Sequence, residues 1–398
     1  MKILQVNAVY KTGSTGRNIY EMHEVFKRKG IKSYIAATHI DTTSINDCYQ
    51  IGNKIDWINH AIMSRIFGIQ GYFSKKATKK FLRYIKEINP DIIHLNNVHA
   101  NYLNFPAIFK FFSENDIAVV ITLHDCWFYT GKCTHYTLAK CSKWQTGCYD
   151  CPRKKIDNKS WFFDRTNKMW NDKKEWYESI SNLAVVGVSD WITEEAKKSI
   201  LKSAKTIRKI YNWVDLDVFK PKIEKIKKFE DKFVILGVAS IWNEKKGLDT
   251  FIKLSSYLKD DEIIVLVGEL PQIDLPSNIV HIATINDIQE LALFYSLADV
   301  FLQLSMEESF GKVVAESLSC GTPIITINST ANKELVPKQC GIVLEKMNIK
   351  DIYDAIMTIR IKTKKFFSKN CRQFAEENFE MEKCINEYIS LYKEMIRI

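Results

Sequence analysis

The chain of 398 residues lacks a long uninterrupted apolar segment. Nowhere do about 18 apolar residues follow one another, so no transmembrane helix is expected. The apolar run at the N-terminus stops at Asn7, which is too short for the core of a signal peptide. These absences predict a cytoplasmic protein, whose ten cysteines are more readily thiols or metal ligands than disulfides.

The sequence also lacks low-complexity stretches, Pro/Gly-rich linkers and internal repeats, which argues against disorder and against a solenoid. Hydrophobic residues make up 46% of the chain, ample for burial, and the length favours two α/β domains of roughly 150–200 residues each. The net charge of +10 suits an anionic partner: nucleic acid, an acidic membrane surface or a phosphorylated substrate.

Ten short β-branched runs, apolar on both faces, alternate with longer amphipathic stretches. Such runs are typical of buried parallel strands. Their repeated alternation with helices predicts an α/β fold with two doubly wound, Rossmann-like sheets. The runs are 3–6, 34–37, 92–95, 119–123 and 184–188 in the first half, and 234–238, 263–267, 300–304, 323–326 and 342–344 in the second.

The switch between the halves lies near residues 211–215, before a charged stretch that leads into a new strand. We therefore expect a first domain at 1–214 with a Cys-rich insert at 133–151, and a second domain at 215–380. Apolar residues at helical spacing predict a C-terminal helix at 381–398 that packs back on the first domain.

Two glutamates follow one strand of the second half. Glu308 would lie in the loop after 300–304, and Glu316 about a turn into the next helix. Gly311 would let the backbone approach a ligand closely, and the helix N-terminus near Lys312 offers free N–H groups to a phosphate. The alternative is a pair of solvated carboxylates on a surface helix. The strand, acidic loop, glycine and helix in this order favour a binding site.

This stretch resembles the signature of the retaining GT-B glycosyltransferases with a Glu, seven residues, Glu motif, of the group 1 or family 4 type. The resemblance runs nearly end to end, and the cysteines after His124 resemble members that act in colanic acid, capsule or O-antigen assembly. It is carried by residues 13–16, 91–94, 124–125, 212–219, 238–249, 267–268 and 295–316.

The resemblance implies two Rossmann-like domains facing across a cleft, the first binding the acceptor and the second the donor. It implies transfer of a hexose from a UDP- or GDP-sugar to a saccharide acceptor. In polysaccharide assembly this acceptor is expected to be lipid-linked, and no catalytic metal is expected. Glu316 would bind the ribose hydroxyls, Glu308 the donor sugar and Lys246 the leaving diphosphate. Backbone groups would bind phosphate, sugar or base at Phe310, Gly311, Lys312, Thr284 and Ile285.

One departure from the family pattern is the absence of an arginine shortly before Lys246. Lys245 is the candidate replacement, although a solvated loop lysine is equally compatible. In the first half, Gly13 and Gly16 follow the first strand and could line the diphosphate. They do not complete a G-x-G-x-x-G motif, so a nicotinamide site is not favoured. His124 is assigned to positioning the donor sugar.

Two other histidines stay outside the predicted site. His94, inside a strand, is interpreted as a packed, hydrogen-bonded residue. For His99, nearness in the sequence to that strand is the only reason to consider a role in the site.

Four cysteines fall within nineteen residues: Cys133, Cys141, Cys148 and Cys151. Four thiolates can close a tetrahedral site with no position left for water, so we expect a structural Zn²⁺. Cys126 and His135 are possible substitute ligands. The alternative is a set of free buried thiols.

A basic cluster without acidic residues precedes the third predicted strand, at 92–95. It comprises Lys75, Lys76, Lys79, Lys80 and Arg83, four of them at helical spacings of three and four. We interpret it as a docking surface for the anionic inner leaflet of the plasma membrane; the alternative is a solvated basic helix.

Two rival functions remain. A basic nucleic-acid-binding protein with a zinc loop would explain the charge, but not ten parallel strands and an acidic motif. A nucleotide-sugar epimerase or a phosphorylase would keep the fold. A phosphorylase would usually need a cofactor lysine, for which no motif is present.

Overall fold

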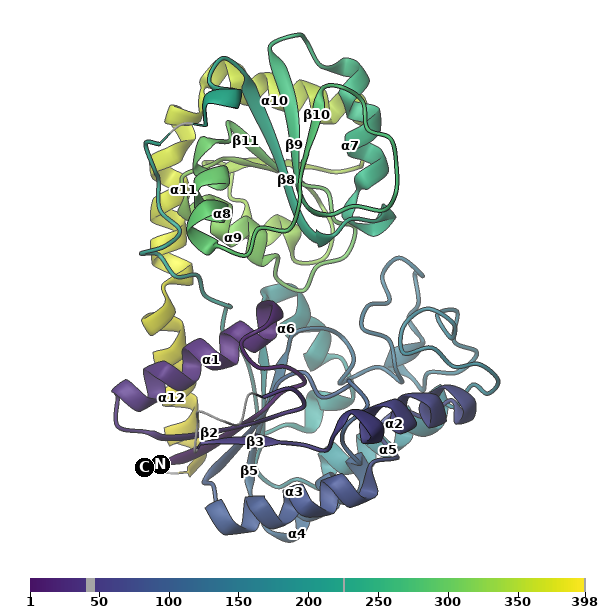
Figure 1. The fold of residues 1–398 in the computed structure, drawn as a ribbon. Helices are drawn as coiled ribbons and strands as arrows, with labels where there is room; N and C mark the ends of the chain where they lie inside the picture. The colour runs from purple at the N-terminus through teal and green to yellow at the C-terminus, as the bar shows by residue number, and fades with distance from the viewer. Residues whose placement is uncertain (41–46, 225, 397–398) are drawn as a thin grey trace. The chain divides into compact units, whose positions relative to one another are not determined.

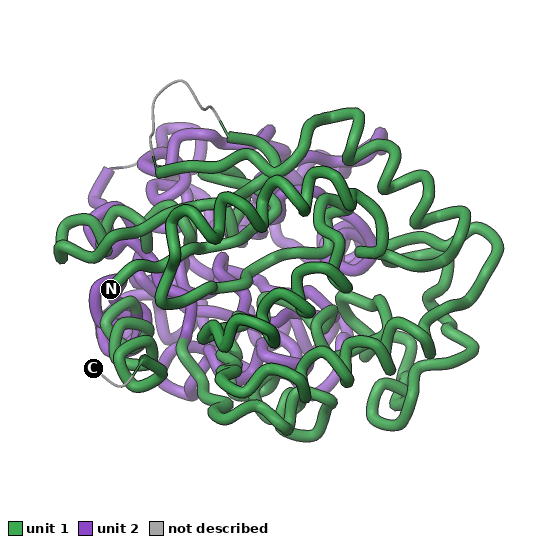
Figure 2. The backbone as a smooth tube through the Cα atoms, turned by 90° about the horizontal axis from the view of Figure 1, so that it is seen from below, with its two compact units in different colours: residues 1–210, 385–398 green, residues 211–384 purple. Residues whose placement is uncertain are grey.

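The computed structural model describes residues 1–40, 47–224 and 226–396. The chain divides into two compact units: unit 1 holds residues 1–210 and 385–398, and unit 2 holds residues 211–384 (Figure 2). Unit 2 begins slightly before the expected boundary at 214. The reason is that the ring of Tyr211 packs against Phe310 and Phe379 of unit 2.

Unit 1 contains a seven-stranded parallel sheet in the order β3-β2-β1-β4-β5-β6-β7, with helices on both faces (Figure 1). The strands are β1 Lys2–Val6, β2 Lys32–Ala37, β3 Cys48–Gln50, β4 Ile92–Leu95, β5 Ala118–Leu123, β6 Leu183–Gly187 and β7 Thr206–Lys209. The α-helices are α1 Gly13–Arg28, α2 Lys54–Phe67, α3 Lys75–Ile88, α4 Phe105–Glu114, α5 Thr166–Glu178 and α6 Asp190–Lys197.

Unit 2 contains a six-stranded parallel sheet in the order β10-β9-β8-β11-β12-β13. Its strands are β8 Phe233–Ile241, β9 Glu262–Glu269, β10 Ile279–Ile282, β11 Val300–Gln303, β12 Ile324–Ile327 and β13 Gly341–Leu344. Its α-helices are α7 Leu248–Leu254, α8 Ile288–Leu297, α9 Lys312–Ser319, α10 Ile349–Lys362 and α11 Lys364–Phe379. The prediction of two Rossmann-like parallel sheets is confirmed.

All ten predicted strands form, and three further strands were missed: β3, β7 and β10. Each of the three lies at an edge of its sheet. An edge strand has one neighbour and is only partly covered, so it needs no continuous apolar run. β7 shows this with the sequence Thr-Ile-Arg-Lys, in which all four residues are half-buried.

The C-terminal helix α12 spans Met381–Ile396, and from Ile385 onward it belongs to unit 1. The expected helix at 381–398 includes two last residues that lie outside the described part. The hydroxyl of Tyr388 lies 3.1 Å from Thr122 Oγ1 on β5, and that of Tyr392 lies 2.7 Å from His94 Nδ1 on β4. The helix therefore packs on the central strands of unit 1.

His94 is completely buried, and its Nε2 also lies 2.7 Å from Thr122 Oγ1. Burial lowers the pKa of His94 to about 3, because the imidazolium would lose its hydration there. The interpretation of His94 as a packed, hydrogen-bonded histidine is confirmed. Within the described ranges, every helix is too short or too polar to cross a bilayer.

Candidate functional site

The acidic loop of unit 2 runs from the end of β11 to the start of α9. Lys246 Nζ lies 2.5 Å from Glu308 Oε1, and Gln303 Nε2 donates to the same oxygen at 3.3 Å. The Glu308 amide donates to Thr330 Oγ1 at 2.9 Å, which ties the loop to the segment after β12. The side chains of Lys246 and Glu308 are 36% and 17% exposed, so the pair remains within reach of a ligand. The structure thus brings together two residues that the sequence assigned separately.

A backbone hydrogen bond connects the loop that carries Lys246 to the acidic loop. The Met306 amide donates to the Lys245 carbonyl at 2.9 Å. Gly247 has a φ of 81°, and a Cβ there would lie 2.7 Å from Cβ of Leu304. Any side chain at this position would push the two loops apart, so glycine is what lets Lys246 approach Glu308. The side chain of Lys245 is exposed, and no carboxylate of the described residues pairs with it.

Glu316 lies on α9 and is buried, with 7% of its surface exposed. Its Oε2 accepts a hydrogen bond of 3.0 Å from the hydroxyl of Tyr295, itself fully buried on α8. Burial raises the pKa of Tyr295 well above its usual value, so the phenol keeps its proton and continues to donate. The carboxylate is therefore held in one orientation at the first turns of the helix.

Gly311 precedes α9 in a left-handed conformation, with a φ of 89°. No atom within 3.4 Å would meet a Cβ there, so the backbone angle rather than space favours glycine. Lys312 then begins the helix, whose N-terminal N–H groups carry partial positive charge. The Phe310 side chain packs against Tyr211 and Phe379.

Thr284 and Ile285 lie in the loop between β10 and α8, where Thr284 is exposed and Ile285 half-buried. Because β10, β9, β8 and β11 are mutually parallel, this loop leaves the sheet at the same edge as the Lys246 and Glu308 loops. The candidate residues of unit 2 therefore gather at one carboxyl edge, the usual ligand-binding side of such sheets.

In unit 1 the candidates also follow strands that end at one edge. Gly13 opens α1 with a φ of 64°, and a Cβ on Gly16 would approach the Val9 carbonyl oxygen to 3.2 Å. His124 follows β5, and its Nε2 lies 3.1 Å from Oδ1 of Asn96, which follows β4. Since β1, β4 and β5 are parallel neighbours, the glycine loop and His124 share the carboxyl edge of this sheet.

A pair that the sequence did not single out lies beside His124. Asp125 Oδ2 lies 2.8 Å from His99 Nε2, and its Oδ1 accepts from the Trp127 amide at 2.8 Å. Burial alone would raise the pKa of Asp125, but the contacts with His99 and Trp127 outweigh it and the pKa is lowered. Proximity to the strand end was the only sequence signal for His99.

The four predicted metal ligands line one small cavity of about 20 Å³: Cys133, Cys141, Cys148 and Cys151. Cys133 Sγ and Cys151 Sγ are 3.8 Å apart, and hydrogen bonding between them lowers the pKa of Cys151 to about 7. All ten cysteines are free thiols. As placed, no group of three or more His, Cys, Asp or Glu side chains among the described residues is arranged to hold a metal.

The candidate substitute ligands lie apart from this cavity. Cys126 and His135 do not belong to its lining, and the His135 ring stacks on Trp191 at 6.4 Å.

Two families of known proteins match consecutive parts of this chain. Residues 15–218 match Glycosyltransferase Family 4, and residues 218–378 match Glycosyl transferases group 1. A protein of Escherichia coli K12 named as a colanic acid biosynthesis glycosyl transferase is 20% identical over 77% of each chain. The UDP-Gal:alpha-D-GlcNAc-diphosphoundecaprenol alpha-1,3-galactosyltransferase of Escherichia coli is 26% identical over 47% of this chain; the match spans 54% of that protein's length.

Solved structures show the same fold. Sucrose-phosphate synthase from Thermosynechococcus elongatus superposes with a TM-score of 0.72 at 15% identity, with both chains fully covered. HepE of Anabaena in complex with UDP-glucose has a TM-score of 0.66 at 15% identity, covering 98% of this chain and 99% of that one. The two family matches are consecutive, and one of them alone spans half of the chain. The chain therefore belongs to the glycosyltransferases of family 4 and group 1.

Proposed function

We propose that the chain is a retaining glycosyltransferase that moves a hexose from a UDP- or GDP-sugar to a saccharide acceptor in bacterial surface polysaccharide biosynthesis. The observation that carries this is the Lys246–Glu308 pair at the carboxyl edge of the unit 2 sheet, beside the start of α9. The galactosyltransferase relative acts on a UDP-sugar and a lipid diphosphate saccharide by its name, which supports the same substrate classes here.

The roles follow from the contacts. Glu316, oriented by Tyr295, would accept hydrogen bonds from the two ribose hydroxyls. Because the acceptor is charged, each bond would contribute roughly 1.5–3 kcal/mol to binding. Lys246 would exchange its contact with Glu308 for the donor diphosphate. Glu308 would then be free to bind hydroxyls of the donor sugar, and His124 keeps its proposed role in positioning that sugar.

In the proposed step, the bond between the anomeric carbon and the diphosphate oxygen breaks. The acceptor oxygen bonds to the same face of that carbon, and its proton passes to the leaving diphosphate. Lys246 and the N–H groups at the start of α9 would stabilise the charge on the diphosphate. Since fixed cations and amides perform this task, no catalytic metal is proposed.

The test is the stereochemistry of the product. With a panel of UDP- and GDP-sugars and a saccharide acceptor, we expect transfer with retention of the anomeric configuration, at a rate that survives EDTA. The configuration is read by NMR of the product. Inversion, or strict dependence of the zinc-intact protein on added Mg²⁺ or Mn²⁺, would overturn this mechanism. Donor conversion without acceptor would favour the epimerase alternative.

We further propose that unit 1 docks on the anionic inner leaflet through α3. Lys75, Lys76, Lys79, Lys80 and Arg83 are all exposed, while Phe81 and Ile85 on the opposite face are buried in unit 1. Each cation near an anionic surface can contribute about 1 kcal/mol, so several together would give reversible attachment.

Vesicle flotation tests the docking. We expect the chain to float with anionic vesicles, less in high salt, and to lose binding when Lys75, Lys76, Lys79 and Lys80 all become Glu. A matched variant reverses four exposed lysines of unit 2: Lys346, Lys350, Lys365 and Lys369. Equal binding to neutral vesicles, or equal losses in both variants, would contradict docking through α3.

A further inference from the structure

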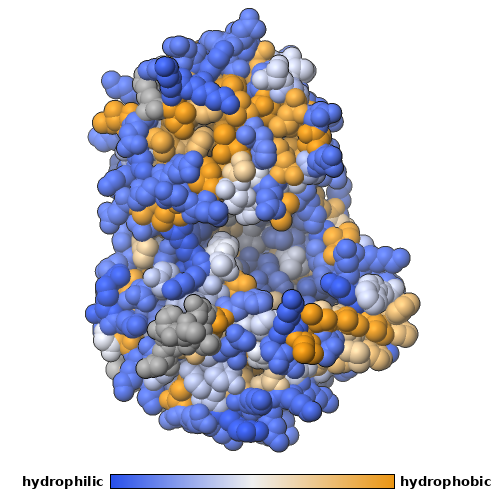
Figure 3. Space-filling model, viewed as in Figure 1, coloured by the Kyte–Doolittle hydropathy of each residue, from blue (hydrophilic) through white to orange (hydrophobic). Residues whose placement is uncertain are grey.

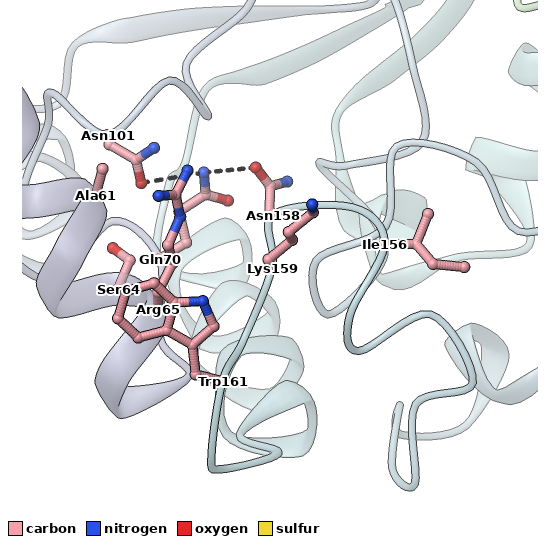
Figure 4. A pocket seen from close by; sticks show the side chains of 9 residues that line it. All are labelled: Ala61, Ser64, Arg65, Gln70, Asn101, Ile156, Asn158, Lys159 and Trp161. Atoms are coloured by element: carbon pink, nitrogen blue, oxygen red, sulfur yellow. Dashed lines mark hydrogen bonds between the residues drawn. The ribbon is translucent and has the colours of Figure 1, made fainter. Parts of the chain in front are cut away.

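A polar pocket of about 450 Å³ lies wholly within unit 1, between α2 and residues 156–161, which follow the Cys-rich segment (Figure 4). Helix α2, which lines the pocket, is capped at both ends. Asn53 and Asp56 form a capping box at its start, and Gly68 closes it in a left-handed conformation. Three amides and two cations line the pocket, together with an indole: Gln70, Asn101, Asn158, Arg65, Lys159 and Trp161.

The amides of the pocket are held in place before any ligand binds. Gln70 Nε2 donates to Asn158 Oδ1 at 2.8 Å, and Gln70 Oε1 accepts from Trp127 Nε1 at 2.9 Å. Asn158 Nδ2 donates to the Lys132 carbonyl at 3.0 Å. Gln70 also donates to the carbonyl of His99, in the loop after β4, which places the pocket near the carboxyl edge of the sheet that carries His124.

The cations of the pocket have no balancing charge. Arg65 and Lys159 are exposed, and no carboxylate among the described residues lies within ion-pair distance of either. None of the nine described residues that line the pocket is acidic. Ser64, also in the lining, has a buried hydroxyl without a hydrogen-bond partner in the described part of the chain. Such a set of donors fits a phosphate, which an arginine fork binds well.

Exposed apolar side chains border these cations. Ile55, Ile58 and Ile62 precede Arg65 at spacings of three and four on α2, and they are 70%, 47% and 40% exposed. In the neighbouring loop, Phe162 is 65% exposed. Hydrophobic residues gather at this edge of unit 1 over α2 (Figure 3).

The helix and the loop form one continuous surface, because the Trp161 amide donates to the Arg65 carbonyl at 2.7 Å. Cations beside exposed aliphatic and aromatic groups suit an amphiphile whose charged head joins a hydrocarbon chain.

We propose that this pocket binds the diphosphate of a lipid-linked acceptor, with Arg65 and Lys159 on the phosphates and the apolar side chains on the hydrocarbon chain. The inference rests on the proposed transferase function, since it specifies the acceptor of that reaction. The pocket offers cations and amides but no carboxylate for ribose hydroxyls, which distinguishes it from the donor site around Glu316.

Binding of farnesyl diphosphate to the full chain tests the inference by calorimetry. A Lys246→Gln background weakens the competition of the donor site for the diphosphate. We expect binding that the Arg65→Gln, Lys159→Gln double variant weakens about 100-fold, about tenfold for each lost charged contact. Matched substitutions of two exposed cations elsewhere in unit 1, Lys202→Gln with Lys205→Gln, should leave it unchanged. Inorganic pyrophosphate should bind more weakly than farnesyl diphosphate, and its affinity should not change with Phe162→Ser.

Unchanged affinity in the Arg65, Lys159 double variant would overturn the inference. An unfolding temperature equal to that of the Lys246→Gln parent shows that a loss of affinity does not come from unfolding. Pyrophosphate binding as tight as that of farnesyl diphosphate would also overturn it, because the pocket would then serve a soluble phosphate. The proposed function is checked apart from this, by sugar transfer in the chain that retains Lys246. A chain that binds farnesyl diphosphate in the pocket but transfers no sugar would refute the function and leave the diphosphate site standing.

Discussion

Replacing Glu308 with alanine is expected to lower kcat by about 10²–10³-fold while nucleotide affinity changes little. The carboxylate would contact the donor sugar where charge develops in the transition state, and removing one such group typically costs about 3–4 kcal/mol. It also holds Lys246 at 2.5 Å, so the variant leaves the lysine without its partner before the donor arrives. The loss should therefore appear in turnover, measured under saturating donor.

Glu316→Ala is expected to act differently. Its carboxylate lies back on α9 against Tyr295, at the position proposed for the ribose, so its loss should chiefly raise the Kd of the nucleotide. Two lost hydrogen bonds to a charged acceptor correspond to about 100-fold or more. Thermal shift with UDP and with GDP measures this directly, because a bound nucleotide stabilises the fold by mass action.

An exposed carboxylate of the same unit, Glu290 on α8, provides the matched control. Glu290→Ala should change neither turnover nor nucleotide affinity. A Glu308→Ala, Glu316→Ala double variant with full activity would show that the donor site lies elsewhere.

The buried strands were predictable because a parallel strand covered on both faces must be apolar on both faces. β5 and β6 are examples, since every residue in them is buried. The same reasoning fails at sheet edges, where β7 keeps an arginine and a lysine. The approach of Lys246 to Glu308 was only partly predictable. The parallel order of the sheet places their loops at one edge, but the contact depends on the left-handed Gly247 against Leu304.

The polar pocket beside α2 could not be predicted from local patterns. Gln70 and Asn158 are 88 residues apart, and neither stands in a motif. Their hydrogen bond exists because the segment after the cysteines folds back onto α2, where the Trp161 amide meets the Arg65 carbonyl. Sequence periodicity reports which face of one element is buried, and it carries no information about such long-range pairing. The same holds for the His99–Asp125 pair, whose members lie 26 residues apart.

The positions of the sulfur atoms in the Cys-rich segment are the reason for proposing a metal there. Cys133 Sγ and Cys151 Sγ are 3.8 Å apart, far beyond the roughly 2.05 Å of a disulfide bond. A tetrahedron of sulfurs with Zn–S bonds of about 2.3 Å has edges of about 3.8 Å. Cys141 and Cys148 line the same cavity, and the Gly131 amide donates to Cys148 Sγ at 3.2 Å. As placed, these side chains do not form a metal-binding group among the described residues, and we propose that a bound Zn²⁺ would draw the four sulfurs around this cavity.

Purified, untagged protein is accordingly expected to contain about one equivalent of Zn²⁺ by elemental analysis. Cys148→Ser should lose the metal and strongly destabilise unit 1, since structural zinc can contribute on the order of 10 kcal/mol to folding. The loss should be seen as a lower unfolding temperature and as protease cleavage within residues 133–165. Cys48→Ser, which alters a half-buried thiol of the same unit outside the cavity, should keep both zinc and stability. Freshly prepared protein without zinc, or a Cys148→Ser variant as stable as the parent, would show that these cysteines are ordinary buried thiols.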